Sequence, residues 1–297
     1  MSDKLRAYFY LHFCVFIWGF TAILGKLITL TAVPLVWWRV LIASSVLAVF
    51  IPRAQWKMVT RTAFFQMSGI GVLVALHWLC FYGAIKLSNA SVAVATMATT
   101  SFFAALTEPF ILKQRVKWYE LGIGLIILPG MALVVGNIDW NMRTGFAVGA
   151  VGALLAALFS SLNKKMIENN PQPPLVMSAV ELGAATITCT MILPWLLWST
   201  PDTAVWPGEG DWYWLLLLSL ACTVLPYYLS LRAMKYITAF AANLTINLEP
   251  VYGILLAALF FREDKELNSN FYIGMAVILL AVFSHPFLKQ RFDREAL

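Results

Sequence analysis

The groups of this sequence with the greatest chemical potential are ionisable side chains in the middle of long apolar segments. Glu249 lies near the centre of the apolar stretch 238–261 and is followed by Pro250. An ionisable group at the centre of a membrane helix costs roughly 2.5–3.5 kcal/mol on insertion scales, so it is a functional candidate. Proline removes a helical hydrogen bond and opens the turn before it. Glu249 and a freed carbonyl could bind a cation or an amine, or carry a proton; a structural glutamate, protonated or paired, is the alternative.

Arg39 and His77 are two further ionisable residues within apolar segments, and both have aromatic neighbours. Trp38 precedes Arg39, while Trp78 and Tyr82 follow His77. Arg39 could capture a substrate carboxylate, pair with an acidic residue, or extend partway to the interface. A histidine can titrate near neutral pH, although a lone histidine is more often a hydrogen-bonded core residue. All five side chains are candidates for substrate binding or coupling.

Polar residues on the same apolar segments complete the set of candidates. Roles in binding or coupling, or else hydrogen bonds between helices, are expected for six residues: Glu181, Thr96, Thr100, Tyr228, Asn243 and Asn247. Asn243 and Asn247 lie one helical turn apart, so they form one polar stripe. Glu249 lies about 200° further around a continuous helix from Asn247, and therefore on another face. The pattern leaves open which face lines a cavity.

Charged residues close to the ends of the apolar segments have a simpler interpretation. Glu108 precedes Pro109 near the end of the segment 89–112. Lys26, Lys164 and Lys165 lie near the ends of other segments. We expect all four side chains to reach the membrane interface.

The elements that must position these residues are ten apolar segments, each close to the roughly 20 residues that cross a bilayer. They are 8–29, 33–51, 63–85, 89–112, 118–136, 144–167, 174–198, 212–233, 238–261 and 270–288. The chain is 61% hydrophobic and 12% charged, with a mean hydropathy of +0.77, whereas a soluble domain is about 25% charged. The sequence predicts an all-α integral membrane protein with ten transmembrane helices.

The distribution of basic residues predicts the orientation of these helices. Of the 21 Lys and Arg residues, fifteen fall at one set of helix ends and one, Arg39, lies within a segment. The opposite ends hold the other five: Lys26, Lys86, Arg143, Arg262 and Lys265. Basic residues concentrate on the cytoplasmic side. We therefore expect a multi-pass protein of the plasma membrane, such as the bacterial inner membrane, with both termini in the cytoplasm.

Several kinds of chemistry have no signature in the sequence. No Walker loop, HExxH motif or GxSxG motif is present, and the basic residues are dispersed among short loops. The four cysteines lie within apolar segments and form no CxxC pair. We expect no enzyme activity, cofactor, metal site or nucleic-acid partner. The expected partners are a small-molecule substrate, the lipid bilayer and a coupling proton, and the expected state is a monomer.

The two halves of the chain show a weak internal repeat. PLVWWRVLIA at 34–43 resembles PLVMSAVELG at 174–183. An offset of 149 places 83–115 on 232–264 and aligns six identical residues, among them Thr96 with Thr245. We predict one five-helix repeat at 1–138 and a second at 139–297, which together form one transport domain. Because five is odd, the second copy starts from the opposite side of the membrane, which makes the repeat inverted.

These features together resemble a known family. The ten segments, the two halves, the sequence WGFTAILGK at 18–26 and the spacing of Pro34 and Arg39 are similar to the EamA type of the drug/metabolite transporter superfamily. The resemblance implies a transporter and does not name its cargo. We expect a secondary transporter that works by alternating access, most simply an exporter of amino acids or related small metabolites. An uptake carrier for a choline-like organic cation, or a channel, is the alternative.

Overall fold

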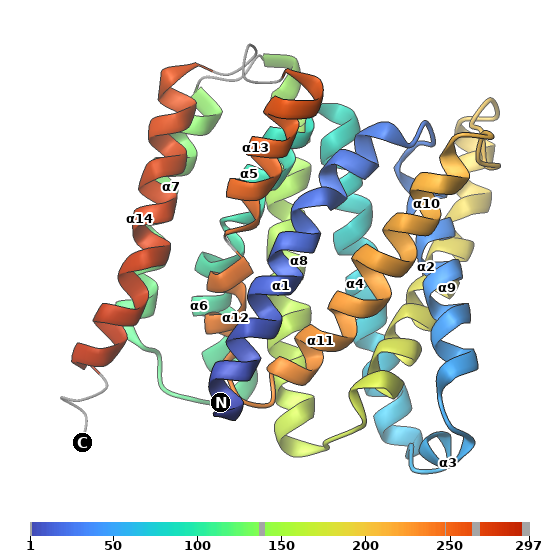
Figure 1. The fold of residues 1–297 in the computed structure, drawn as a ribbon, viewed down its shortest axis with the longest axis horizontal. Coiled ribbons are helices and arrows are strands. Elements are labelled where there is room, and N and C mark those ends of the chain that lie inside the picture. Colours follow the sequence, from blue (N-terminus) through green and yellow to red (C-terminus); the bar gives the residue numbers. More distant parts are fainter. Residues whose placement is uncertain (1, 137–139, 247, 263–267, 293–297) are drawn as a thin grey trace.

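The computed structural model describes the whole chain except residues 1, 137–139, 247, 263–267 and 293–297. All secondary-structure elements within the described ranges are helical (Figure 1). They are α1 (Asp3–Leu27), α2 (Ala32–Phe50), α3 (Arg53–Trp56), α4 (Arg61–Leu87), α5 (Ala90–Met97), α6 (Thr100–Leu112), α7 (Trp118–Gly136), the 3-10 turn η1 (Trp140–Met142), α8 (Arg143–Asn169), α9 (Pro174–Ser199), α10 (Asp211–Ser219), the π turn η2 (Leu220–Val224), α11 (Leu225–Ala233), α12 (Ala239–Ile246), α13 (Glu249–Phe261) and α14 (Ser269–Phe292). The predicted all-α fold is confirmed.

The predicted membrane spans correspond closely to these helices. Eight helical segments in the described residues are long and apolar enough to cross a membrane. Two shorter apolar segments, Trp118–Gly130 in α7 and Ser269–Ala281 in α14, occupy the places of the fifth and tenth predicted spans. The chain is therefore a multi-pass membrane protein whose helix order matches the prediction.

Two of the spans are broken in the middle, and the breaks correspond to each other. The fourth span consists of α5 and α6, and the ninth consists of α12 and α13. Adding 149 to the bounds of α5 (90 and 97) and α6 (100 and 112) gives 239, 246, 249 and 261, which are the bounds of α12 and α13. The offset found in the sequence is thus reproduced by the backbone.

Corresponding residues at the ends of the two broken spans are also 149 positions apart. Asn89 accepts a hydrogen bond from the backbone N–H of Val92 (2.8 Å), as Thr238 does from Ala241 (3.1 Å). Such side-chain acceptors satisfy backbone donors at a helix N-terminus. At the other end, the last turns of α6 and α13 close on Lys113 (φ 56°) and Arg262 (φ 58°), both left-handed. Each pair differs by 149 residues.

The packing of the helices interlocks the two halves of the chain. The first helix of the second half, α8, packs on α4, α5 and α6, while α1 packs on α11, α12 and α13. Figure 1 shows α5 beside α13 and α6 beside α12, and α7 paired with α14 at one edge. These reciprocal contacts support the predicted inverted repeat. Its boundary at 138 and 139 lies outside the described residues, so the division into two units stays a prediction.

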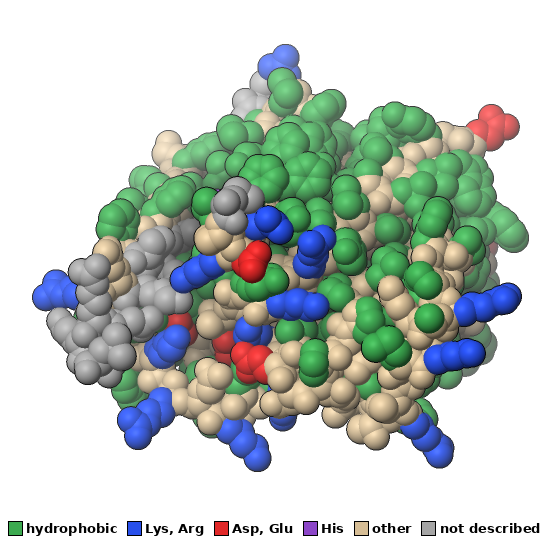
Figure 2. Space-filling view, turned by 60° about the horizontal axis from the view of Figure 1, so that its bottom comes forward, with side chains coloured by type: hydrophobic (Ala, Val, Ile, Leu, Met, Phe, Trp, Pro, Cys, Tyr) green, Lys and Arg blue, Asp and Glu red, His purple; other side chains and the backbone are tan. Residues whose placement is uncertain are grey.

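The start of α1 and the end of α14 lie at the same end of the bundle (Figure 1). Figure 2 shows Lys and Arg side chains gathered over this end. Which compartment this end faces stays a prediction, although the gathering of positive charge agrees with the expected cytoplasmic side.

Candidate functional site

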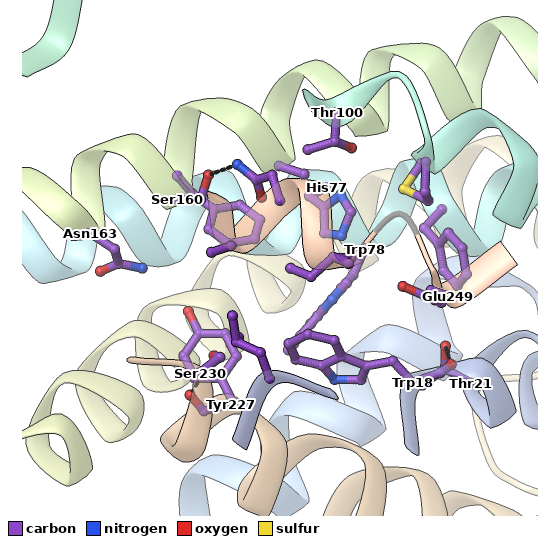
Figure 3. A pocket seen from close by; sticks show the side chains of 18 of the residues that line it. Trp18, Thr21, His77, Trp78, Thr100, Ser160, Asn163, Tyr227, Ser230 and Glu249 are labelled. Carbon is purple, nitrogen blue, oxygen red and sulfur yellow. Dashed lines mark hydrogen bonds between the residues drawn. The ribbon is translucent and has the colours of Figure 1, made fainter. Parts of the chain in front are cut away.

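A cavity of about 120 Å³ lies between the two halves. A cavity of roughly 10–15 Å³ on this measure holds one water molecule, so the space suits a small organic molecule. The walls are mostly apolar, with polar side chains from both halves directed into the space (Figure 3). The lining residues with polar atoms in their side chains are Trp18, Thr21, Arg39, His77, Trp78, Thr100, Ser160, Asn163, Tyr227, Ser230, Asn243 and Glu249.

Both helix breaks open onto this cavity. Met97 and Thr100 flank the break in the fourth span, and Ile246 and Glu249 flank the break in the ninth; all four line the cavity. The N-termini of α6 and α13 therefore lie at the site, where the helix dipole gives a partial positive charge. Discontinuous helices of this kind form the binding sites of many transporters.

The break changes the expected faces of the ninth span. The sequence interpretation placed Glu249 and Asn243 on different faces of one continuous helix. That interpretation is wrong, because α12 ends at Ile246 and α13 begins at Glu249. The two residues belong to different helices, and both side chains line the same cavity.

Arg39 is a buried cation in the wall of the cavity, 2% exposed. Its Nε donates to Thr223 Oγ1 (2.7 Å) and its Nη1 donates to the Tyr82 hydroxyl (2.9 Å). The guanidinium carbon lies 3.9 Å from the centroid of the Trp78 ring, a cation–π contact. Within the described part of the chain, no carboxylate forms an ion pair with Arg39. Two of its five N–H donors are thus used to position it, and the charge stays available to an anion.

The π turn η2 explains how Thr223 reaches Arg39. The hydroxyl of Thr223 donates to the carbonyl oxygen of Leu218 (2.7 Å), which directs its lone pairs toward the arginine. Pro226 follows in the first turn of α11, and proline cannot donate the N–H of a regular helix. Single π turns inside helices frequently occur at functional sites.

Glu249 supplies the opposite charge at the same cavity. It is 7% exposed and is the first residue of α13, where a carboxylate is stabilised by the helix N-terminus. Among the residues that the structure describes, none donates a hydrogen bond to its carboxylate or pairs with it within 4.0 Å. Arg39 and Glu249 therefore share one cavity without neutralising each other directly.

A second carboxylate, that of Glu181 on α9, lies behind the cavity wall and is fully buried. Its Oε2 accepts hydrogen bonds from Asn163 Nδ2 (3.2 Å) and from the Tyr227 hydroxyl, a short contact. Asn163 and Tyr227 themselves line the cavity (Figure 3). Glu181 Oε1 and Asn163 Oδ1 are buried and have no hydrogen-bond partner among the described residues.

His77 and Asn243 line the cavity but are held by the protein. His77 Nδ1 lies 2.9 Å from the carbonyl oxygen of Gly152. Asn243 Nδ2 donates to Ser160 Oγ (2.7 Å), the bond drawn as a dashed line in Figure 3. The expectation that Asn243 bonds across helices is confirmed, and the same bond leaves its carbonyl oxygen at the cavity wall.

Four other predicted residues lie away from the cavity lining. Trp38 packs against two other tryptophans, Trp206 and Trp212, with ring centroids 5.3 and 5.0 Å away. Tyr82 is fully buried and acts through Arg39. Thr96 is buried, and Tyr228 is half-buried.

Thr96 packs against Gly149 of α8, where any side chain would collide with its hydroxyl. The small residue thus permits a close approach between the two halves. Asn247 lies outside the described residues.

Two charged residues expected at the interface are buried instead. The Glu108 carboxylate accepts from the backbone N–H groups of Ala239 (3.1 Å) and Phe240 (2.5 Å), so it caps α12. Lys164 donates to the carbonyl oxygen of Met234 (2.9 Å) and pairs with Glu168 (3.3 Å). Glu108 bonds to the start of α12 and Lys164 to the residue after α11, long-range contacts that position along a single helix does not reveal.

Sequence reasoning missed several residues of the cavity wall, among them Trp18, Ser160 and Asn163. A signal existed for Ser160 and Asn163, because they lie three residues apart and thus on one face of an otherwise apolar helix. Trp18 belongs to the sequence WGFTAILGK, which carried the family resemblance.

Comparison with known proteins gives a consistent result over the whole chain. The model of a family described as the EamA-like transporter family matches residues 5–136 and again residues 143–285. A protein of Bacillus subtilis, the uncharacterized transporter YwfM, is 27% identical over 90% of this chain and 89% of its own length. A protein of Arabidopsis thaliana named UDP-uronic acid transporter 1 is 22% identical over 80% of this chain and 74% of its own.

A solved crystal structure resembles the fold with a TM-score of 0.70 and 15% sequence identity. The match covers 97% of this chain and 99% of the other. At this identity, the similarity concerns the arrangement of the helices.

Proposed function

Because the chain belongs to the EamA-like transporter family, we propose that it carries a small zwitterionic metabolite, such as an amino acid, by alternating access. One observation supports this substrate class more than any other. Arg39 and Glu249 place opposite charges on the wall of one cavity, and neither is paired within 4.0 Å among the described residues. A molecule with both a carboxylate and an ammonium group matches both charges.

Burial strengthens this argument. Charged groups in a low-dielectric interior are costly unless they are paired and hydrogen-bonded. A zwitterionic substrate would offer its carboxylate to the guanidinium of Arg39 and its ammonium to Glu249. The apolar walls, with Trp18 and Phe159, would hold its side chain.

The shape of the cavity supports loading from the end that holds the termini. Its lining extends to Leu11 in the first half of α1 and to Ser230 and Met234 at the end of α11. Both lie toward the end at which α1 begins (Figure 1). With this end in the cytoplasm of a plasma-membrane protein, as we propose, the cavity loads from inside the cell, as an exporter requires.

A choline-like organic cation is the alternative substrate. Glu249 and the aromatic faces of Trp18 and Trp78 would suit it. The buried charge of Arg39 in the same cavity opposes a ligand that carries only positive charge. The zwitterion therefore fits the described side chains better.

Counterflow in proteoliposomes tests the proposal. We would load vesicles with leucine, phenylalanine or serine and measure uptake of the same labelled compound. Isopentylamine and 4-methylpentanoate, which each keep one charge of leucine, should support at least tenfold less counterflow, since a hydrogen bond to a charged group contributes roughly 1.5–3 kcal/mol. Glu249→Gln should lower the affinity for the amino acid by a similar factor, whereas the exposed loop variant Glu209→Gln should not.

Two results would overturn this function. Counterflow with choline and with no amino acid would assign the protein to organic cations. Ion conductance without counterflow of any compound would make it a channel.

A further inference from the structure

We propose that Glu181, Asn163 and Tyr227 form a proton-binding site, separate from the substrate cavity, that is coupled to Arg39 through Tyr227 and Trp78. The inference rests on the transport function proposed above and names the place where a driving proton binds. It assigns coupling to Glu181, and leaves Glu249 to the substrate.

Two buried oxygen atoms that lack hydrogen-bond donors indicate that a positively charged species binds here. Glu181 has 0% exposure, and its Oε1 has no donor in the described structure; the same holds for Asn163 Oδ1. The two side chains are joined by the bond between their other polar atoms, Nδ2 and Oε2 (3.2 Å). Buried acceptors without donors are rare in native proteins, and this network contains two.

A proton satisfies this network with the fewest additional groups. Bound to Oε1, it converts the carboxylate to a carboxylic acid, whose O–H can donate to an acceptor such as Asn163 Oδ1. The negative charge of Glu181 is removed in the same step. A metal cation would need several more oxygen ligands than these two atoms provide.

Among the described residues, no positively charged side chain pairs with Glu181 within 4.0 Å. The helices that pack most extensively on α9 are α2, α4 and α11, and α8 adds the bond from Asn163. The titratable group that faces Glu181 from them is Tyr227 on α11. From α4, Gly71 lies so close that a side chain there would collide with the Glu181 carbonyl oxygen. Lys164, next to Asn163 on α8, is turned to Met234 and Glu168.

From α2, the described contacts with α9 are hydrogen bonds between uncharged groups. Ser44 Oγ lies 3.1 Å from Thr186 Oγ1, and Trp37 Nε1 donates to Thr190 Oγ1 (2.9 Å). These contacts between α2 and α9 in the described structure involve no charged side chain.

A chain of ring contacts links the site to the substrate cavity. The ring of Tyr227, whose hydroxyl bonds to Glu181, lies with its centroid 6.1 Å from that of Trp78, in a T-shaped contact. The other partner of Trp78 is the guanidinium of Arg39, 3.9 Å from the ring centroid. A hydrogen bond to a charged acceptor is about twice as strong as one to a neutral acceptor. Protonation of Glu181 therefore loosens Tyr227, and with it the aromatic support of Arg39.

Infrared difference spectroscopy of the purified protein tests the proton site without any substrate. Changing the pH alone should produce the carbonyl band of a buried carboxylic acid. The band should disappear in Glu181→Gln and persist in Glu249→Gln and in the exposed control Glu209→Gln. In Tyr227→Phe the midpoint of the band should move to higher pH, because a donor that stabilises the charged carboxylate is lost.

Persistence of the band in Glu181→Gln, or its absence from the wild type, would overturn the inference. Should Glu181→Gln fail to fold, an unchanged midpoint in Tyr227→Phe would overturn it instead.

A transport measurement separates this inference from the proposed function. A pH gradient should accelerate net leucine flux at least tenfold in the wild type and in Glu209→Gln, and less than twofold in Glu181→Gln. Leucine counterflow, which needs no gradient, should continue in the wild type and in Glu209→Gln. Loss of wild-type counterflow would refute the proposed function. An intact pH response in Glu181→Gln, or a wild-type response to a sodium gradient alone, would refute only the proton site.

Discussion

Asp211 holds together the end of the bundle opposite to the termini, and Asp211→Asn should open it. Asp211 Oδ1 accepts from the backbone N–H of Thr29 (2.8 Å), and Oδ2 accepts from the Thr29 hydroxyl (2.7 Å) and the N–H of Gly208 (3.1 Å). Lys86 adds a bond to the carbonyl oxygen of Ile28 (2.6 Å). The end of α1, the end of α4 and the start of α10 are thus joined by hydrogen bonds that opening of this end of the bundle would break.

The magnitude follows from the three bonds to the carboxylate. Asp211 is 3% exposed, so solvent screens these bonds little. An asparagine keeps one acceptor oxygen, but its NH₂ group meets donors where the second oxygen stood. One charge-assisted bond, worth roughly 1.5–3 kcal/mol, is therefore lost. Taking about 2 kcal/mol, the population of the opened state should rise roughly 30-fold, since each 1.4 kcal/mol is tenfold.

Accessibility of a cysteine in the cavity measures this population. Thr21 lines the cavity on α1, so Thr21→Cys can be labelled with a membrane-impermeant maleimide added from the side opposite to a terminal tag. The labelling rate should rise roughly 30-fold when Asp211→Asn is added, in line with the estimate above. The protein without Thr21→Cys gives the background from the four native cysteines.

The matched control is Asp202→Asn, which changes an exposed acidic residue in the loop before α10. It should leave the labelling rate unchanged. A rate in Asp211→Asn within twofold of the parent would refute the reasoning, because the three bonds would then not distinguish the two states.

Three further predictions concern the contacts that position the site. Thr223→Val should weaken substrate binding about tenfold without lowering the thermal stability by more than a few degrees, because it removes the acceptor of Arg39 Nε; binding titrations and melting curves check this. Gly149→Ala should destabilise the protein by about 1–3 kcal/mol through collision with Thr96, and Thr96→Ala should restore the loss in the double variant. Glu108→Gln should cost about 1–3 kcal/mol of stability by uncapping α12, measured as unfolding in detergent.

The sequence predicted the fold closely because each span is a local property. A run of about 20 apolar residues fixes a membrane helix without reference to its neighbours. All ten predicted segments correspond to described helices, and the offset of 149 that joined Thr96 to Thr245 also relates the bounds of the broken helices. Local patterns therefore gave the number, order and repeat of the elements.

The candidate site was predictable only in part, because it depends on how helices meet. Arg39, His77 and Glu249 were found from their charge inside apolar runs, and all three line the cavity. Asn163 was missed because it bonds to Glu181 on a different helix. No pattern along one helix reveals such a contact. Helical periodicity predicted the wrong face for Glu249 because α12 ends before it and α13 begins at it.

The two helix breaks have equivalent positions in the backbone but differ in their side chains, and in the proposed function this difference selects the substrate. Thr100 opens α6 and Glu249 opens α13, at positions 149 residues apart. A second carboxylate in place of Thr100 would bring two negative charges into one low-dielectric cavity, where their repulsion and desolvation would be costly. One glutamate and one arginine instead leave the cavity nearly neutral. Alternating access needs two halves whose backbones can exchange conformations. Both halves can therefore keep a helix break while the side chains at the two breaks differ and select the substrate.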